Sequence, residues 1–286
     1  MTGSERRRAF RFVEVDGFQY HFFASDRAFS LRGFYRSDLC VHAAWVYDGE
    51  LREVCRSSRV WRQSDSRYLD ISSEIVELRD KDGEIVIRVR ADDERDGFTA
   101  RVRPQHSFRW KDSFSDANDE VLHQPDLRGR IDFRGATYPA VGYCKHVEWR
   151  QAPRHGGYRF LHGVLDAGRV ALWSADAVFG YRKYDYFKML EADGSLVVAD
   201  AERSSHKQNT IYAKIGAREL RVDFEELGTW ELPLISPTID TLVQQRYGRI
   251  VCTEAGSRRE GVAVTEYGFG KFSDSPVSQA VVPIAD

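Results

Sequence analysis

Four carboxylic acids in the second half of the chain share the faces of predicted strands with apolar side chains. Side chains on one face of a strand recur at every second residue, so the segment from Val170 places Leu172 and Asp176 on one face. The same reasoning applies to the other three acids, which are Asp185, Glu254 and Glu266. An acid enclosed by apolar groups tends to stay protonated near neutral pH, because burial penalises the charged form. Such an acid can act as a general acid toward an alkene, an epoxide or a carbonyl.

Asp185 is the leading candidate among these acids. Tyr184 and Tyr186 flank it, and Phe187 follows on its face of the strand. Glu266 is the second candidate and leads into the sequence Tyr-Gly-Phe-Gly. The ordinary alternative is that each acid lies at a strand end, reaches water, or pairs with an arginine or a lysine. For any single acid, that alternative is the more common arrangement.

Aromatic residues gather in the middle of the sequence. An aromatic wall suits a flat or elongated apolar ligand, and the ring faces can stabilise a developing carbocation. The alternative is that these rings form ordinary core and cross-strand pairs. Together with Asp176, the residues that we expect to line such a pocket are Trp110, Tyr143, Trp149, Trp173, Tyr184 and Tyr186.

Alternation of apolar and polar residues runs through most of the chain and predicts β-strands. Residues 84–90 and 219–224 are clear examples. Asp-Gly pairs suit the positive-φ positions of tight hairpin turns, and they begin at Asp16, Asp48, Asp82, Asp96 and Asp193. These features predict an all-β fold with little helix, built as antiparallel β-barrels or sandwiches.

Two segments depart from the strand pattern. Residues 238–247 place Ile239, Leu242 and Val243 at helical spacing and predict one short helix, although the segment could equally be a loop that enters a strand. Residues 104–128 are long, polar and bounded by prolines, which is typical of a connection between two β units or of a lid. We therefore expect an N-terminal β domain over residues 1–128, including the connecting loop 104–128, and a C-terminal β-barrel domain over residues 129–286.

Composition excludes several classes of partner. The formal net charge is −2, which gives no general attraction to nucleic acid. No apolar run is long enough to span a membrane. The N-terminus lacks the apolar segment of a secretory signal, so we expect a cytoplasmic protein.

Cofactor and metal chemistry have no support in the sequence. Nucleotide-binding glycine loops and the G-x-S-x-G elbow are absent, and the eight histidines lack metal-ligand spacing. The four cysteines lie far apart, which favours reduced, mostly buried thiols over disulfides or a zinc site. We expect neither a cofactor nor a metal ion. The sequence leaves the oligomeric state open, a homodimer included.

Two segments resemble a known family. Residues 142–149, Gly-Tyr-Cys-Lys-His-Val-Glu-Trp, resemble the junction motif of lipocalin-like proteins of the carotenoid 1,2-hydratase and AttH type. Residues 266–272, Glu-Tyr-Gly-Phe-Gly-Lys-Phe, resemble the closing strand of the same group. In the junction motif the family's acid falls on Lys145, the Trp-Gly step is displaced to Glu148-Trp149, and His146 keeps its place.

The resemblance implies two consecutive lipocalin-like β domains that bind a hydrophobic terpenoid- or polyketide-like molecule. Our leading hypothesis is a cofactor-independent lyase or isomerase that catalyses hydration, dehydration or cyclisation. Asp185 or Glu266 would donate the proton, His146 and nearby tyrosine hydroxyls would orient it or accept a proton, and Trp149 and Trp173 would line the pocket.

Two other hypotheses remain. The first is a non-catalytic carrier of lipids or terpenoids with the same fold, which needs the pocket but not the acids. The second is a β-sandwich protein that binds or processes carbohydrate, for which the spacing of paired carboxylates would be diagnostic. The absence of a secretion signal argues against the carbohydrate hypothesis.

Overall fold

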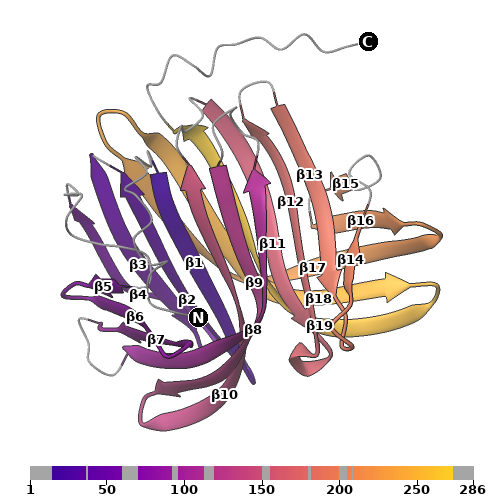
Figure 1. The fold of residues 1–286 in the computed structure, drawn as a ribbon, viewed down its shortest axis with the longest axis horizontal. Helices are drawn as coiled ribbons and strands as arrows, with labels where there is room; N and C mark the ends of the chain where they lie inside the picture. Colours follow the sequence, from indigo (N-terminus) through magenta and orange to yellow (C-terminus); the bar gives the residue numbers. More distant parts are fainter. Residues whose placement is uncertain are drawn as a thin grey trace, which may run out of the picture.

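The described part of the chain consists almost entirely of antiparallel strands (Figure 1). The computed structural model describes residues 15–36, 38–59, 70–91, 96–112, 119–149, 155–179, 182–199, 205–207 and 209–272. In these residues the only helical element is a single 3-10 turn, Asp166–Gly168. The all-β prediction is confirmed.

Two sheets divide the strands between them. The first sheet contains β1 (Val15–Ala24), β2 (Arg27–Arg36), β3 (Leu39–Tyr47), β4 (Leu51–Arg59), β5 (Asp70–Ser72), β6 (Val76–Lys81), β7 (Glu84–Val89), β8 (Phe98–Asp112), β9 (Asp119–Phe133) and β10 (Ala136–Trp149). The second sheet contains β11 (His155–Leu165), β12 (Val170–Phe179), β13 (Arg182–Leu190), β14 (Leu196–Val198), β15 (Ser205–Lys207), β16 (Thr210–Ile215), β17 (Arg218–Ile235), β18 (Asp240–Glu254) and β19 (Ser257–Lys271).

Both sheets have the same topology. In each one the chain forms a meander whose first and last strands pair, β1 with β10 and β11 with β19. In each one the outermost strands are the fourth and fifth in chain order, so that β4 and β5 flank the first sheet and β14 and β15 flank the second. The described residues therefore form two consecutive antiparallel β units of matching design.

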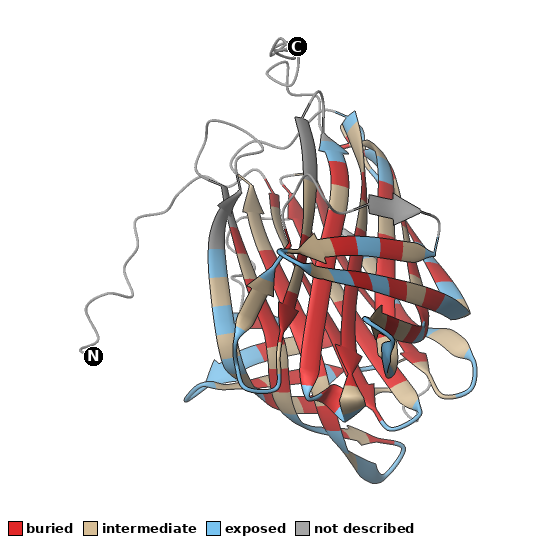
Figure 2. Cartoon of the chain, turned by 90° about the vertical axis from the view of Figure 1, so that its right-hand side faces the viewer, coloured by how far each residue is buried: buried red, intermediate tan, exposed pale blue. Residues whose placement is uncertain are grey.

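Each sheet encloses a core on one face and packs against the other sheet with its opposite face. The inner core of the first sheet includes Tyr20, Phe22 and Phe29, and the inner core of the second includes Leu172 and Phe187. A third apolar cluster joins the two sheets, and its members come from both: Phe23, Trp45, Trp230, Tyr247 and Val264 are among them. Figure 2 shows the buried segments running through the middle of the molecule. The β1, β2 and β10 strands of the first sheet and β11, β18 and β19 of the second therefore have both faces covered.

Alternation and turn chemistry explain the local structure. In β7 the buried residues alternate, as predicted for residues 84–90, and β17 includes the predicted segment 219–224. Asp82 and Gly83 form a hairpin turn with φ of 55° and 78°, which joins β6 to β7. Asp16-Gly17 was expected to form a similar turn, but this pair lies inside β1.

Two expectations about departures from strand structure are wrong. Residues 104–112 belong to β8 and residues 119–128 belong to β9, and the two strands pair instead of forming a connection. Residues 113–118 lie outside the described residues. Bulges around His106 accommodate the irregular sequence within that pair. As a result, the chain passes from the first sheet to the second between Trp149 and His155, and not at residue 128.

The segment expected as a short helix is also a strand. Asp240 begins β18, and Thr241, Val243, Gln245 and Tyr247 are buried in alternation. A period of two overrides the helical spacing of Ile239, Leu242 and Val243, because β18 lies between β17 and β19 and one of its faces meets the first sheet.

The cysteines behave as predicted. Cys40, Cys55, Cys144 and Cys252 are all buried and free of disulfides. Among the described residues, no helix is long and apolar enough to cross a membrane.

Candidate functional site

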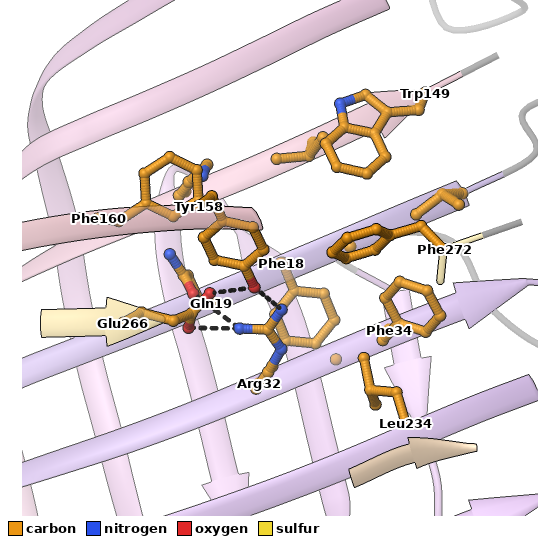
Figure 3. A pocket seen from close by; sticks show the side chains of 15 residues that line it. Phe18, Gln19, Arg32, Phe34, Trp149, Tyr158, Phe160, Leu234, Glu266 and Phe272 are labelled. Carbon is orange, nitrogen blue, oxygen red and sulfur yellow. Dashed lines mark hydrogen bonds and ion pairs between the residues drawn. The ribbon is translucent and has the colours of Figure 1, made fainter. Parts of the chain in front are cut away.

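A small pocket lies between the two sheets (Figure 3). Strands β1, β2 and β10 of the first sheet and β11 and β19 of the second supply most of its walls. Its cavity has a volume of about 60 Å³. The lining residues are Val15, Gly17, Phe18, Gln19, Arg32, Gly33, Phe34, Lys145, Val147, Trp149, Tyr158, Phe160, Leu234, Glu266 and Phe272.

One end of the pocket is aromatic. Figure 3 shows Trp149, Phe34, Leu234 and Phe272 together, away from the charged residues. Toward the middle, Tyr158 stacks on Phe160 with 4.6 Å between ring centroids. This wall gives the pocket an apolar surface suited to a hydrophobic ligand.

The other end of the pocket carries a buried ion pair that joins the two sheets. Nη1 of Arg32 in β2 donates a hydrogen bond to Oε2 of Glu266 in β19. Only 2% of the Glu266 side chain and 13% of the Arg32 side chain are exposed. Arg32 also donates to Oε1 of Gln19 at 3.2 Å, so the guanidinium is fixed from its own sheet as well.

Further hydrogen bonds hold the Glu266 carboxylate. The hydroxyl of Tyr158 donates to Oε1 at 2.8 Å, and Nε2 of Gln245 donates to Oε2 at 2.6 Å. Gln245 is itself oriented, because its Oε1 accepts a 2.6 Å hydrogen bond from the indole of Trp45 in the first sheet. Because every donor in this network is buried or partly buried, the carboxylate has a fixed position.

Charge keeps Glu266 ionised despite its burial. Burial by itself raises the pKa of the carboxyl, but the charge and hydrogen bond of Arg32, together with the hydrogen bond of Gln245, lower the pKa more, to below its ordinary value. For Tyr158, burial and the neighbouring Glu266 charge raise the pKa, so its hydroxyl keeps its proton. The expectation that an acid on this strand face is protonated is therefore wrong for Glu266. The arginine that reverses it comes from a strand 234 positions away in the sequence.

Lys145 adds a second positive charge to the pocket. It is 7% exposed, and its Nζ lies 3.1 Å from the centre of the Phe160 ring. Its charge contributes to the lowered pKa of Glu266. In the resemblance, this is the position where the family has an acid, so the local charge is inverted here.

Beyond the charged end, a group of buried histidines and aromatics continues along the interface. The ring of His162 stacks on Tyr143 with a centroid separation of 3.8 Å, and His21 lies 5.4 Å from His162. Tyr143 and His123 share a hydrogen bond between the hydroxyl and Nδ1. Burial lowers the pKa of His21 to about 4, and burial also lowers those of His123 and His162, so all three rings are neutral at pH 7.

Four of the predicted pocket residues lie on this interface. Trp149 lines the pocket directly. Tyr143, Trp173 and Tyr186 belong to the aromatic group beyond the charged end, where Trp173 and Tyr186 pack around His123. The side chains of Trp110 in β8 and Tyr184 in β13 lie outside the described part of the structure.

Asp185 and Asp176 are not in the pocket. They face each other across β12 and β13, on the face of the second sheet that carries Leu172 and Phe187 of its inner core. Glu266 lies on the opposite face, since its register partner Phe160 aligns with Ala175 and not with Asp176. The structure therefore separates Asp185 from Glu266.

His146 is also separate from the pocket. It is aligned with Phe18 on the face of the first sheet that carries the inner core, and its Nε2 lies 2.8 Å from Oδ1 of Asp16. Its neighbour Lys145 points to the other face and lines the pocket. Glu254, the fourth acid, pairs with Arg218, as the ordinary alternative predicts.

Sequence reasoning missed Arg32, Gln19 and Gln245. A usable signal was present for Arg32, which shares a strand face with Ala28 and Phe34 and is therefore an arginine in line with apolar residues. For Gln245, the helical reading of residues 238–247 hid the alternation that would have placed it beside Val243 and Tyr247. Among the described residues, no group of three His, Cys, Asp or Glu side chains could hold a metal ion.

Comparison with known proteins supports the fold. Neither a family model nor a curated relative matches the sequence. Solved structures do match. An AttH-type protein from Nitrosomonas europaea superimposes with a TM-score of 0.59 at 12% identity, covering 93% of this chain and 96% of that one.

Two further structures give the same result. Kievitone hydratase from Nectria haematococca has a TM-score of 0.60 at 8% identity, over 90% of this chain and 89% of its own. CghA, solved with Sch210972, has a TM-score of 0.50 at 10% identity, over 92% and 89%. The resemblance to lipocalin-like proteins of the AttH type is therefore confirmed at the level of the fold, which by itself does not determine the reaction.

Proposed function

We propose that this protein is a cofactor-independent lyase or isomerase that acts on a hydrophobic, terpenoid- or polyketide-like small molecule bound between its two sheets. One observation carries the proposal: an ionised carboxylate, Glu266, is held at the charged end of a pocket whose other end is largely aromatic. A buried ion pair is seldom the most stabilising solution for a protein interior, so its presence in a pocket is a sign of function.

The free acceptor site on Glu266 makes it a proton acceptor in this proposal. A carboxylate has about four acceptor sites. Among the described residues, Arg32 and Gln245 donate to Oε2 and Tyr158 donates to Oε1, which leaves one site on Oε1. Glu266 thus acts as the general base, and not as the proton donor that the sequence alone indicated.

Lys145 completes an acid–base pair. In the direction of dehydration, a C–H bond next to a hydroxyl-bearing carbon breaks and its proton passes to Oε1 of Glu266. The electron pair forms the new double bond, the C–O bond breaks, and the leaving hydroxide takes a proton from Nζ of Lys145 to become water. After dehydration, a proton that passes from Glu266 to Lys145 restores the starting state. Hydration is the reverse of all these steps. For isomerisation, the proton returns to another carbon.

The size of the cavity limits how the substrate enters. Ligand pockets commonly enclose about 300–1,000 Å³, whereas this cavity encloses about 60 Å³. A terpenoid- or polyketide-like ligand therefore requires the side chains at the aromatic end to rotate. Trp149 is suited to this, because it is only partly buried.

Turnover of natural extracts tests the proposal. The protein is incubated with the organic extract of its source cells, and mass spectrometry follows compounds that gain or lose water or change isomeric form. We expect wild type and Asp185→Asn to convert the same compound, because Asp185 lies on the other face of the sheet. Glu266→Gln should reduce the rate at least a hundredfold, within the range of a general base. Equal rates for wild type and Glu266→Gln would rule out the assignment of the base.

A carrier is the second candidate, and one observation favours it. Three of the acceptor sites of Glu266 are already filled by protein donors, as in a purely structural ion pair. A carrier would retain a compound from the extract without converting it, and Glu266→Gln would change only the affinity.

A further inference from the structure

Three buried polar side chains next to the pocket have ring or amide nitrogens without a hydrogen-bond partner in the described part of the chain. They are Nε2 of Gln19 and both ring nitrogens of His21 and of His162. The exposed fractions of the three side chains are 4%, 0% and 1%. A buried donor or acceptor that stays unsatisfied costs about 1–3 kcal/mol, so five such atoms in one place need an explanation.

The orientation of Gln19 is fixed by its neighbour. Arg32 can only donate, so the atom that it contacts at 3.2 Å must be the amide oxygen of Gln19. The NH₂ group of Gln19 is therefore the end without a partner. Gln19 lines the pocket, so this donor is at the pocket wall.

Strand register places the two histidines beside this donor. His21 follows Gln19 by two residues on the same face of β1, and His162 follows Phe160 by two residues on the same face of β11. Gln19 and Phe160 both line the pocket. The rings of His21 and His162 approach each other across the two sheets with 5.4 Å between centroids. The three side chains thus lie in one row along the interface, starting at Gln19, which contacts Arg32 of the ion pair.

The charges around His21 and His162 favour a neutral ligand group over a charged one. Arg32, Lys145 and Glu266 all act on His21, and a charge on His21 disfavours protonation of His162. A neutral imidazole offers one donor and one acceptor, and the Gln19 amide offers donors. A hydroxyl group matches this set, because it can accept from Gln19 and donate to an imidazole nitrogen. A metal ion does not, since the described residues provide no third ligand of the required type.

We propose that Gln19, His21 and His162 form a polar subsite that binds one hydroxyl group, either of a water molecule or of an alcohol on the pocket's ligand. The proposal deepens the proposed function, on which it rests for the identity of the ligand. In that reaction the subsite holds the water that is added or released, or a hydroxyl that sets the position of the substrate relative to Glu266. The class of substrate is then a hydrophobic molecule with an alcohol near its reacting end.

A crystal structure of the ligand-free protein is the first test. At a resolution that shows ordered solvent, we expect a water molecule within hydrogen-bonding distance of Nε2 of Gln19 and of a ring nitrogen of His21 or His162. An interface that is dry at this position overturns the proposal. This outcome is independent of whether Glu266 catalyses any reaction, so it is distinguishable from a failure of the proposed function.

A pair of probes then separates water from a ligand alcohol. Phenol and benzene differ by one hydroxyl, and calorimetry gives the affinity of each for wild type and for His162→Phe. We expect the preference for phenol over benzene to fall about tenfold in the variant, because the aromatic volume is kept and the hydroxyl partner is lost. An unchanged preference, or a failure of phenol to bind better than benzene to wild type, would restrict the subsite to water and overturn its role in binding the ligand.

A matched control distinguishes loss of the hydroxyl-binding group from general destabilisation by replacement of a buried histidine. His42 is also buried, but it lies in the first sheet away from the pocket and has a partner, the hydroxyl of Tyr35 at 2.6 Å. His42→Phe should leave the phenol preference at the wild-type value. A second variant, His21→Phe, should reproduce the effect of His162→Phe, and its failure to do so would contradict a shared subsite.

Discussion

Arg32 and Glu266 form an ion pair across the interface, although 234 positions separate them in the sequence. Arg32 belongs to the first sheet and Glu266 to the second, and both side chains are nearly excluded from water. Because one residue of the pair comes from each sheet, the ion pair at this end of the pocket forms only when the two sheets are packed together.

Removing one partner of the pair should be costly. Arg32→Met leaves Glu266 buried without its main counter-charge, and breaking a buried pair in this way costs about 3–5 kcal/mol. The pKa of Glu266 should rise, since burial then acts without the opposing charge. Urea denaturation measures the loss in unfolding free energy. The double variant Arg32→Met with Glu266→Leu should recover part of it.

An exposed pair provides the control for this experiment. The Arg258 and Glu260 side chains are 64% and 68% exposed, so Glu260→Gln should change stability by less than about 1 kcal/mol. A loss for Arg32→Met as small as that of the control would show that the buried pair does not stabilise the interface.

Gly268 should tolerate no side chain. It pairs with Tyr158, and a Cβ at this position would run into the Tyr158 ring. Gly268→Ala should therefore displace the ring, break the hydrogen bond from Tyr158 to Glu266, and cost about 1–3 kcal/mol as overpacking does. Thermal unfolding and the binding of the pocket's ligand are the measurements, and both should decline.

Gly157 offers a close match as a control. It lies on the same strand as Tyr158, but a Cβ there would be no nearer than 3.7 Å to any atom of its neighbours. Gly157→Ala should leave ligand binding unchanged. If Gly157→Ala and Gly268→Ala were equally harmful, the effect would come from replacing any glycine in these strands and not from displacing the Tyr158 ring.

Acid should destabilise the protein through its buried histidines. Burial lowers the pKa of His21 from 6.5 to about 4 in the folded state, so between these values the unfolded chain binds a proton that the folded protein does not. Stability is therefore complete above pH 6.5 and declines as the pH falls toward 4. By pH 5 the loss from His21 alone should be about 2 kcal/mol, and His123 and His162 act in the same direction.

Unfolding free energies between pH 7 and pH 5 test this dependence. In that window the lowered pKa of Glu266 leaves its carboxylate ionised, so the change reports mainly on the histidines. His21→Phe should flatten the curve. A curve with the same slope as wild type would show that His21 does not titrate in the way its burial predicts.

The cysteines should be inert in the native protein. All four are buried, and burial raises the pKa of Cys252 to about 11. Because the thiolate is the reactive form, Ellman's reagent at pH 8 should modify the folded protein slowly and all four thiols quickly in urea. Rapid modification of the folded protein would indicate that one of these cysteines is accessible.

The sequence predicts the class of fold well because its signals are local. Alternation and Asp-Gly turns depend on neighbouring residues, so the strands around residues 84–90 and 219–224 could be identified without knowledge of the tertiary structure. Residues 104–128 and 238–247 were misread because their neighbours in the sheet determine their conformation. In both segments pairing with long adjacent strands outweighs local propensity.

The candidate site was predictable only in part. Glu266 and Trp149 could be singled out from strand faces and aromatic composition, and both line the pocket. Asp185 fits the same pattern, but alternation shows only that a residue shares a face with apolar neighbours. It does not show which of the two faces meets the other sheet. The sequence therefore could not separate Asp185 from Glu266 or pair Glu266 with Arg32.

The position of the pocket between the sheets links ligand binding to assembly of the molecule. A compound that contacts both walls binds only to the packed form, so by mass action it strengthens the attachment of the first half to the second. At a concentration of one hundred times its dissociation constant, such a ligand contributes about 2.7 kcal/mol. If the two halves were expressed as separate chains divided between Trp149 and His155, a compound that binds in the pocket would promote their association. Its identity could then be found by screening for reassociation, with no knowledge of the reaction.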